Sequence, residues 1–271
     1  MQTDWTHAFD NNAYIPNLDQ IAADWNAQAA ALRLKLFSEN RAKIDVSYGP
    51  DDRQCFDLFL PKGTPKGLVL FVHGGYWQAF DKATFSHFSQ GPLDHGWAVA
   101  VPSYRLTPQV TMTEIGLDVA SAVNAAASFV DGPIRLTGSS AGGHLVARMA
   151  CQDSHLAEET AHRLEKVLSI SGLHDLRPIR FAKMNTVLQM SELEAASESP
   201  ALLEPRVVLP ISFWVGAGER PELIRQTRLI AEIWGAKSHL VQDFYEPNQD
   251  HFTVVCGLQD ASSPLVQELL A

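Results

Sequence analysis

Short apolar runs that alternate with helix-length segments constrain the fold of this chain most. Apolar runs of four or five residues are typical of strands buried on both faces of a parallel sheet. The runs cover residues 68–72, 97–101, 134–137, 167–170 and 211–215. Segments of helical length lie between or after them, at residues 85–95, 114–130, 143–151 and 221–234, and a last strand is expected over 239–245. The alternation predicts an α/β fold with a mostly parallel, doubly wound sheet.

Two further strands are expected before the first apolar run. Residues 42–48 and 54–60 alternate between apolar and polar side chains, and the Gly-Pro-Asp-Asp sequence at 49–52 has the composition of a turn. These strands form an antiparallel pair and bring the predicted sheet to about eight strands. Because the sequence contains neither an internal repeat nor a low-complexity linker, we expect a single domain over residues 1–271.

Composition and charge exclude several classes of protein. Hydrophobic residues make up 46% of the chain and charged residues 19%, which is ordinary for a globular protein. The formal net charge is -10 and the basic residues do not cluster, so no nucleic-acid partner is expected. The three cysteines lack the spacing of a disulfide framework or a zinc site, and neither a signal peptide nor a membrane span is predicted. These features favour a cytoplasmic protein with no membrane partner, and they are compatible with a homodimer.

The pentapeptide Gly-Ser-Ser-Ala-Gly at residues 138–142 is the main chemical signal in the chain. It follows an apolar run and precedes a segment of helical pattern, which is the context of a nucleophile elbow. In such a turn the strained backbone presents the serine hydroxyl, and the flanking glycines let the chain pack closely. The pattern predicts Ser140 as a nucleophile. Because short patterns of small residues also occur by chance in loops, the prediction depends on finding partner residues.

A serine hydroxyl needs a base within hydrogen-bond reach and an acid that orients the base. His251 follows the last predicted strand in the loop 246–251, where a base can reach Ser140, although it could also be a surface histidine. Glu219 follows the predicted strand 211–215 and precedes the histidine, which is the order required of the acid. Asp175, which follows the preceding strand, is the alternative acid, or it caps its own loop.

An oxyanion hole needs N–H groups fixed near the reacting carbonyl. The residue after the nucleophile, Ala141, is expected to supply one of them. The others are expected from the segment His-Gly-Gly-Tyr-Trp at 73–77, through the backbone of Gly74, Gly75 and Tyr76. We expect His73 to fix this loop by hydrogen bonds rather than to take part in catalysis. The alternative interpretation is an ordinary tight turn after a strand.

The sequence also indicates where a substrate pocket lies. Tyr76 and Trp77 offer aromatic surface to a substrate or pack against neighbouring elements, and Ser139 adjoins the nucleophile. Residues 177–209 interrupt the alternation and are predicted to form a small helical insertion. Since ligands bind beyond the carboxyl ends of parallel strands, the insertion is expected to cover the site as a partial lid. Residues 21–37 predict a helix that lies on the domain or beside the active site.

Several segments together resemble one family. The chain resembles the kynurenine formamidase branch of the α/β-hydrolases, close to the hormone-sensitive-lipase-like carboxylesterases, over essentially its whole length. The segments are His-Gly-Gly-Tyr-Trp at 73–77, Ser-Tyr-Arg-Leu at 103–106, Gly-Ser-Ser-Ala-Gly-Gly-His at 138–144, Ser-Gly-Leu-His-Asp-Leu at 171–176 and Asp-His-Phe at 250–252. The resemblance implies an α/β-hydrolase fold with Ser140, Glu219 and His251 as its triad. The family usually has aspartate at the acid position, so Asp175 stays open as the alternative.

These observations predict a serine hydrolase that cleaves a small ester or an aryl formamide through an acyl-enzyme. No metal-hydrolase, P-loop or dinucleotide motif appears, so no cofactor is expected. The first alternative is a promiscuous short-chain carboxylesterase or thioesterase. A second alternative is a non-catalytic α/β-hydrolase that serves as a ligand-binding module, because fold alone does not fix function.

Overall fold

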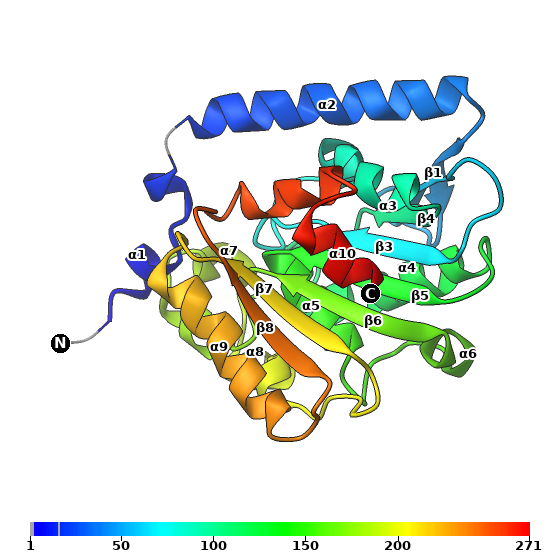
Figure 1. Ribbon diagram of the computed structural model, residues 1–271. Helices are drawn as coiled ribbons and strands as arrows, with labels where there is room; N and C mark the ends of the chain where they lie inside the picture. Colours follow the sequence, from blue (N-terminus) through cyan, green and yellow to red (C-terminus); the bar gives the residue numbers. More distant parts are fainter. Residues whose placement is uncertain (1–2, 16) are drawn as a thin grey trace.

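A computed structural model describes residues 3–15 and 17–271, and its centre is an eight-stranded sheet (Figure 1). The strand order is β1-β2-β4-β3-β5-β6-β7-β8. The pairs β1/β2 and β2/β4 are antiparallel, and all the remaining neighbouring pairs are parallel. The strands are β1 Ala42–Ser47, β2 Cys55–Phe59, β3 Leu68–Val72, β4 Ala98–Pro102, β5 Ile134–Ser139, β6 Leu164–Ile170, β7 Ile211–Gly216 and β8 Val241–Glu246. The predicted fold class and the antiparallel first pair are confirmed.

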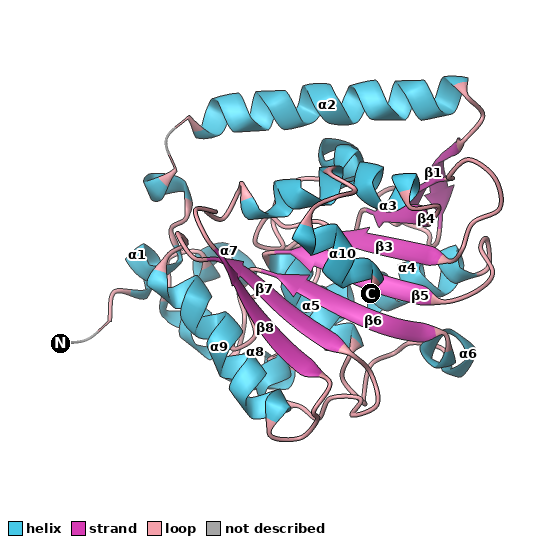
Figure 2. Ribbon diagram, in the orientation of Figure 1, coloured by secondary structure: helices cyan, strands magenta, loops and turns pink. Residues whose placement is uncertain are grey.

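Helices lie on both sides of the sheet (Figure 2). One side carries α4, α5 and α9, and the other carries α3 and α10 with α2 outside them. The α-helices are α1 Trp5–Phe9, α2 Leu18–Ser38, α3 Gln90–Asp94, α4 Met112–Ala127, α5 Ala141–Met149, α6 Glu158–His162, α7 Asn185–Leu188, α8 Glu192–Ser197, α9 Pro221–Gly235 and α10 Pro264–Leu270. The 3-10 helices are η1 Asn12–Tyr14, η2 Lys82–Ser89, η3 Arg177–Phe181, η4 Pro200–Leu202 and η5 Val254–Gln259.

The pleat of the sheet divides the buried side chains between two cores. Along β3, Leu70 and Val72 pack with α4 and α5, while Val69 and Phe71 pack with the opposite layer. Successive side chains of a strand point to opposite faces, so a strand covered on both sides must be apolar at every position. This is why the central strands appear in the sequence as continuous apolar runs.

The N-terminal part of the chain lies outside these layers. The long helix α2 runs along the top of the molecule in Figure 1 and packs on η2, where the rings of Trp25 and Phe88 are 5.2 Å apart. Leu32 and Leu36 of the same helix are buried in one of the two cores. Among the described helices, none is long and apolar enough to cross a membrane.

Candidate active site

Ser140 lies at a strained turn between β5 and α5. Its backbone angles are φ 57° and ψ -118°, a region that residues with a side chain rarely adopt. A Cβ on Gly142 would lie 1.9 Å from the carbonyl oxygen of Val72, and a Cβ on Gly138 would lie 2.5 Å from that of Gly142. The flanking positions therefore need glycine, and the turn places Ser140 at the carboxyl end of β5.

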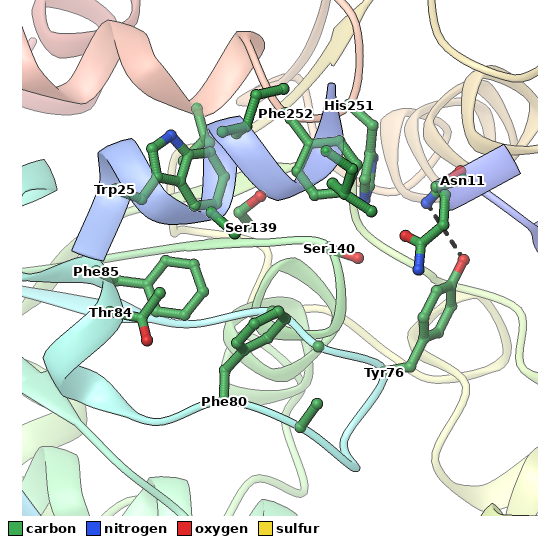
Figure 3. Close-up of a pocket in the computed structure, with 18 of the residues that line it drawn as sticks. Asn11, Trp25, Tyr76, Phe80, Thr84, Phe85, Ser139, Ser140, His251 and Phe252 are labelled. Atoms are coloured by element: carbon green, nitrogen blue, oxygen red, sulfur yellow. Dashed lines mark hydrogen bonds between the residues drawn. The ribbon is translucent and has the colours of Figure 1, made fainter. Parts of the chain in front are cut away.

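Ser140 lines a cavity of about 330 Å³ (Figure 3). Ser139, His251 and the loop residues Gly74, Gly75 and Tyr76 line the same cavity. Four of the other lining residues are aromatic and come from elements that are distant in sequence. These aromatic residues are Trp25 of α2, Phe80 and Phe85 around the start of η2, and Phe252 after β8.

His251 and Glu219 form a buried hydrogen-bonded pair. The distance between His251 Nδ1 and Glu219 Oε2 is 2.7 Å, and the carboxylate side chain is fully buried. The second carboxylate oxygen accepts bonds from the backbone N–H of Gly216 at 2.9 Å and from the Ser171 hydroxyl at 2.5 Å. With Glu219 ionised, Nδ1 of a neutral His251 carries the proton, so Nε2 is free to act as an acceptor.

Asp175 has different partners. Its two carboxylate oxygens accept bonds from the guanidinium of Arg177 at 2.9 and 3.0 Å, and one of them also accepts the backbone N–H of Arg177. A bidentate guanidinium pair of this kind is strong and specific in geometry. Of the two acids that the sequence left open, the one that contacts the imidazole is Glu219.

The loop after β3 lies against Ser140. A Cβ on Gly74 would be 3.1 Å from the Cβ of Ser140, which is closer than an ordinary van der Waals contact. The next three residues have positive φ: Gly75 at 108°, Tyr76 at 47° and Trp77 at 57°. Such strain persists only where surrounding contacts hold it. Ala141, the first residue of α5, has an N–H that no preceding helical carbonyl can accept.

Buried side chains hold this loop in place. His73 Nδ1 bonds the carbonyl oxygen of Gly74 at 2.7 Å, and the Tyr104 hydroxyl donates to the carbonyl of His73 at 2.9 Å. The imidazole is stacked between Phe85 and Tyr104, with ring centroids 5.5 and 4.4 Å away. Burial lowers the pKa of His73 to about 4, so the ring is neutral and its Nδ1–H donates to Gly74. His73 therefore acts on the shape of the loop.

Trp77 is a correction to the predicted pocket. Its side chain is fully buried in the core and packs edge-on against His144 of α5 at 5.2 Å. It does not line the cavity, because the positive-φ turn places the indole beneath the loop, where its burial stabilises the fold. The alternative that the sequence offered, a packing role, describes Trp77 correctly. Tyr76 and Ser139 do line the cavity.

The cover of the cavity comes from the N-terminus. We call residues 5–15 and 18–25, which contain α1, η1 and the first two turns of α2, the N-terminal cover; it contributes Asn11, Leu18, Ile21 and Trp25 to the cavity wall. None of the described residues of 177–209 lines the cavity, which differs from the expected lid. The insertion instead packs beside α5 and α9 and contacts α1, where the N–H of Lys183 bonds the Thr6 hydroxyl at 2.8 Å. It supports the cover from one side.

Sequence reasoning missed most of the aromatic wall and Asn11. Trp25 lies in the helix that was expected beside the site, so its position in the chain was a usable signal. Phe80, Phe85 and Phe252 gave no signal, because a loop phenylalanine looks alike in a sequence whether it lines a cavity or a core. Within the described ranges, no cluster of three or more His, Cys, Asp or Glu side chains is arranged to hold a metal ion.

Comparison with known proteins places the chain in a family. The BD-FAE family model matches residues 56–223, more than half of the chain. The chain belongs to the BD-FAE family. It is 31% identical to the kynurenine formamidase of Salmo salar over 243 residues, which cover 84% of this chain and 80% of that protein. It is also 36% identical to a probable isoprenylcysteine alpha-carbonyl methylesterase of Arabidopsis thaliana, over 38% of this chain and 23% of that protein.

A solved structure matches this family member along its entire length. The crystal structure of a candidate thioesterase from Silicibacter sp. has a TM-score of 0.94 and 42% sequence identity, with 100% of both chains covered. The fold, the family and these hydrolase relatives identify the chain as an α/β-hydrolase enzyme of the serine hydrolase class. Small esters and formamides are the substrates that fit such relatives.

Proposed function

We propose that this enzyme cleaves aryl formamides or small esters through an acyl-enzyme on Ser140. In this proposal His251 is the general base and Glu219 is the acid that orients it. The observation that carries the proposal is the 2.7 Å bond between His251 Nδ1 and Glu219 Oε2, because it leaves Nε2 unprotonated in the cavity that Ser140 lines.

The reaction follows from the roles of these groups. As Ser140 Oγ attacks the carbonyl carbon, its proton passes to His251 Nε2, and Glu219 stabilises the imidazolium. The N–H of Ala141 and N–H groups of the loop 74–76 bind the oxyanion that develops. Collapse of this intermediate breaks the C–N or C–O bond, and the imidazolium protonates the leaving amine or alcohol. A water molecule then repeats the sequence on the acyl-enzyme, which releases the acid and frees Ser140.

The aromatic wall supports an aryl substrate. The ring centroid of Trp25 lies 5.7 Å from that of Phe85 and 5.9 Å from that of Phe252. Phe80 packs edge-on against Phe85, with ring centroids 5.7 Å apart. A planar ring can stack or pack edge-on against such a surface, which contributes about 0.5 to 1.5 kcal/mol per aromatic pair beyond area burial. The similarity to a kynurenine formamidase agrees with a formamide as the group that is cleaved.

Thioester cleavage is the second candidate, because the matching solved structure is that of a candidate thioesterase. Coenzyme A carries several negative charges, and sites that bind phosphates usually supply arginine or lysine. None of the described residues that line the cavity is Lys or Arg, and the chain has a net charge of -10. These charges favour a small or neutral acyl donor over a coenzyme A thioester.

The test combines a substitution with a set of substrates. Ser140→Ala should lower kcat by about a million-fold, as loss of a triad serine does in other hydrolases. Ser139→Ala, the neighbouring serine in the same cavity, is the matched control and should lose no more than about tenfold. Steady-state kinetics on N-formylkynurenine, p-nitrophenyl acetate and an acyl-coenzyme A then rank the substrate classes by kcat/KM. If the Ser140→Ala variant kept a tenth of the activity, the proposal would be wrong.

A further inference from the structure

Residues 8–11 of the N-terminal cover are hydrogen-bonded to the loop that contains Glu219 and Arg220 and to the loop 73–77. Arg220, the neighbour of Glu219, donates from Nε to the carbonyl of Ala8 at 3.0 Å and from Nη1 to that of Asp10 at 3.2 Å. Tyr76 donates its hydroxyl to the carbonyl of Phe9 at 2.6 Å. Three consecutive carbonyls are thus each held by a side chain from a loop next to the nucleophile or the acid.

The orientation of the Asn11 carboxamide follows from these bonds. Asn11 Nδ2 lies 3.3 Å from the Tyr76 hydroxyl oxygen. Burial raises the pKa of this phenol, so it keeps its proton, and that proton is donated to Phe9. The hydroxyl oxygen can then only accept, so the carboxamide atom that faces it must be the NH₂ group. The carboxamide oxygen Oδ1 is left for another partner.

Asn11 Oδ1 has no donor among the described residues. The side chain is only 4% exposed, Oδ1 is itself buried, and Asn11 does not cap η1 with its side chain. An unpaired buried carbonyl oxygen costs free energy, so positions of this kind are usually satisfied by a ligand or water.

Asn11 also lines two cavities. It lines the cavity of Ser140 and a second cavity of about 640 Å³, which Glu219 and Arg220 line as well. His251 is the other residue that is common to both walls. Figure 3 shows Asn11 with His251 and Tyr76 on either side of it.

We propose that Asn11 Oδ1 accepts a hydrogen bond from the N–H of a scissile amide, and that Asn11 thereby selects amides over esters. The leaving atom must lie near His251, which protonates it, and Asn11 and His251 line the same two cavities. An amide offers an N–H at that atom, whereas an ester offers an oxygen with lone pairs that repel Oδ1. The inference rests on the proposed function and adds a specificity-determining residue to it.

The experiment compares formanilide with phenyl formate, which differ at the leaving atom. In Asn11→Leu the ratio of kcat/KM for the anilide to kcat/KM for the ester should fall about tenfold or more, because only the anilide loses a bond. Asn12→Leu is the matched control, because Asn12 lines the same cavity and its substitution leaves Asn11 and the bond to Tyr76 in place. In this variant kcat/KM for the two substrates should change together. A ratio that does not move in Asn11→Leu overturns the inference.

The wild-type enzyme supplies an independent test if Asn11→Leu does not fold. N-methylformanilide lacks the N–H, so the enzyme should prefer formanilide about tenfold more than the ratio of the two alkaline hydrolysis rates. A preference no larger than that chemical ratio contradicts the inference, and so does an enzyme that cleaves the ester and not formanilide. Failure of the proposed function differs from both, because it would appear as activity that survives Ser140→Ala.

Discussion

The elbow region and the N-terminal cover face each other across the cavity, but different contacts hold them. The elbow region, residues 138–143 with the loop 73–77, is packed so closely that a Cβ on any of four glycines would lie less than 3.0 Å from a backbone atom; these are Gly75, Gly138, Gly142 and Gly143. The N-terminal cover is held by side chains: Arg220 and Tyr76 bond its backbone carbonyls, Phe9 is buried in one core, and Trp25 packs against the other. Close backbone packing leaves no room for substitution, whereas side-chain contacts can be exchanged with less effect on the backbone. In the proposed function, the elbow region carries out the reaction and the cover contributes to substrate choice.

The largest effect is expected from the acid that serves the elbow region. Glu219→Gln removes the charge that stabilises the imidazolium and should lower kcat by about ten-thousand-fold. Asp175→Asn is the matched control, since that carboxylate binds Arg177 and should affect mainly stability. Steady-state kinetics on both variants check this. The assignment of the acid would be reversed if Asp175→Asn lost more activity than Glu219→Gln.

A glycine substitution tests how tightly the elbow region is packed. In Gly142→Ala the new Cβ would lie 1.9 Å from the Val72 carbonyl oxygen, so the variant should lose about 4 kcal/mol of unfolding free energy or fail to fold. Gly235→Ala, at the end of α9, has no atom within 4 Å of the new Cβ and should be neutral or stabilised by about 0.5 kcal/mol. Urea unfolding measures both. Equal stabilities would show that the elbow can relax.

Buried histidines should make the free energy of unfolding sensitive to acid. Burial lowers the pKa of His73, His87 and His144 to about 4, below their ordinary 6.5. The unfolded chain therefore binds more protons between pH 6.5 and pH 4, so stability is full above pH 6.5 and falls as the pH drops through that window. From pH 7 to pH 5 each should contribute a loss of roughly 2 kcal/mol.

The variant His87→Leu checks the sign of this effect. Neither ring nitrogen of His87 has a partner among the described residues, so the substitution should flatten the dependence of unfolding free energy on pH. The exposed His155 gives the control His155→Leu, which should leave the slope unchanged. Unfolding titrations at several pH values measure the slope. A steeper slope in His87→Leu would contradict the account.

The smallest effect on activity is expected from a substitution that loosens the N-terminal cover. Arg220→Leu frees the carbonyls of Ala8 and Asp10, so KM should rise about tenfold while kcat falls less. Arg225→Leu, in the helix α9 that follows Arg220, removes only an ion pair with Glu222 and is the control. A loss confined to kcat would mean instead that Arg220 acts through its neighbour Glu219.

Sequence reasoning predicted the sheet and the strained turn at Ser140 for physical reasons. Strands buried on both faces must be apolar throughout, and the elbow needs its glycines, so both features appear locally in the chain. The choice between Glu219 and Asp175 cannot be made from the residues that surround each of them in the sequence, because both acids follow adjacent parallel strands. It depends on Ser171 and the N–H of Gly216, which bind one oxygen of Glu219 and leave the other for His251.

The cover could not be predicted from local pattern. The insertion at 177–209 and the N-terminal segment both contain helices, and packing between distant residues decides which of them reaches the cavity. Arg220 bonds carbonyls more than 200 positions away, and Trp25 packs on Phe85 and Phe252. The position of Asn11 could not be predicted from the sequence either, since it depends on the contact with Tyr76.

The most direct test of the central claim is the rate and site of labelling by a fluorophosphonate. If Ser140 is activated by the pair of His251 and Glu219, wild-type protein should gain a single adduct, and peptide mapping should locate it at residues 138–142. Labelling should be abolished in Ser140→Ala and at least a hundredfold slower in His251→Ala, by roughly the contribution of a general base. An adduct on another residue, or an equal rate in His251→Ala, would contradict the account.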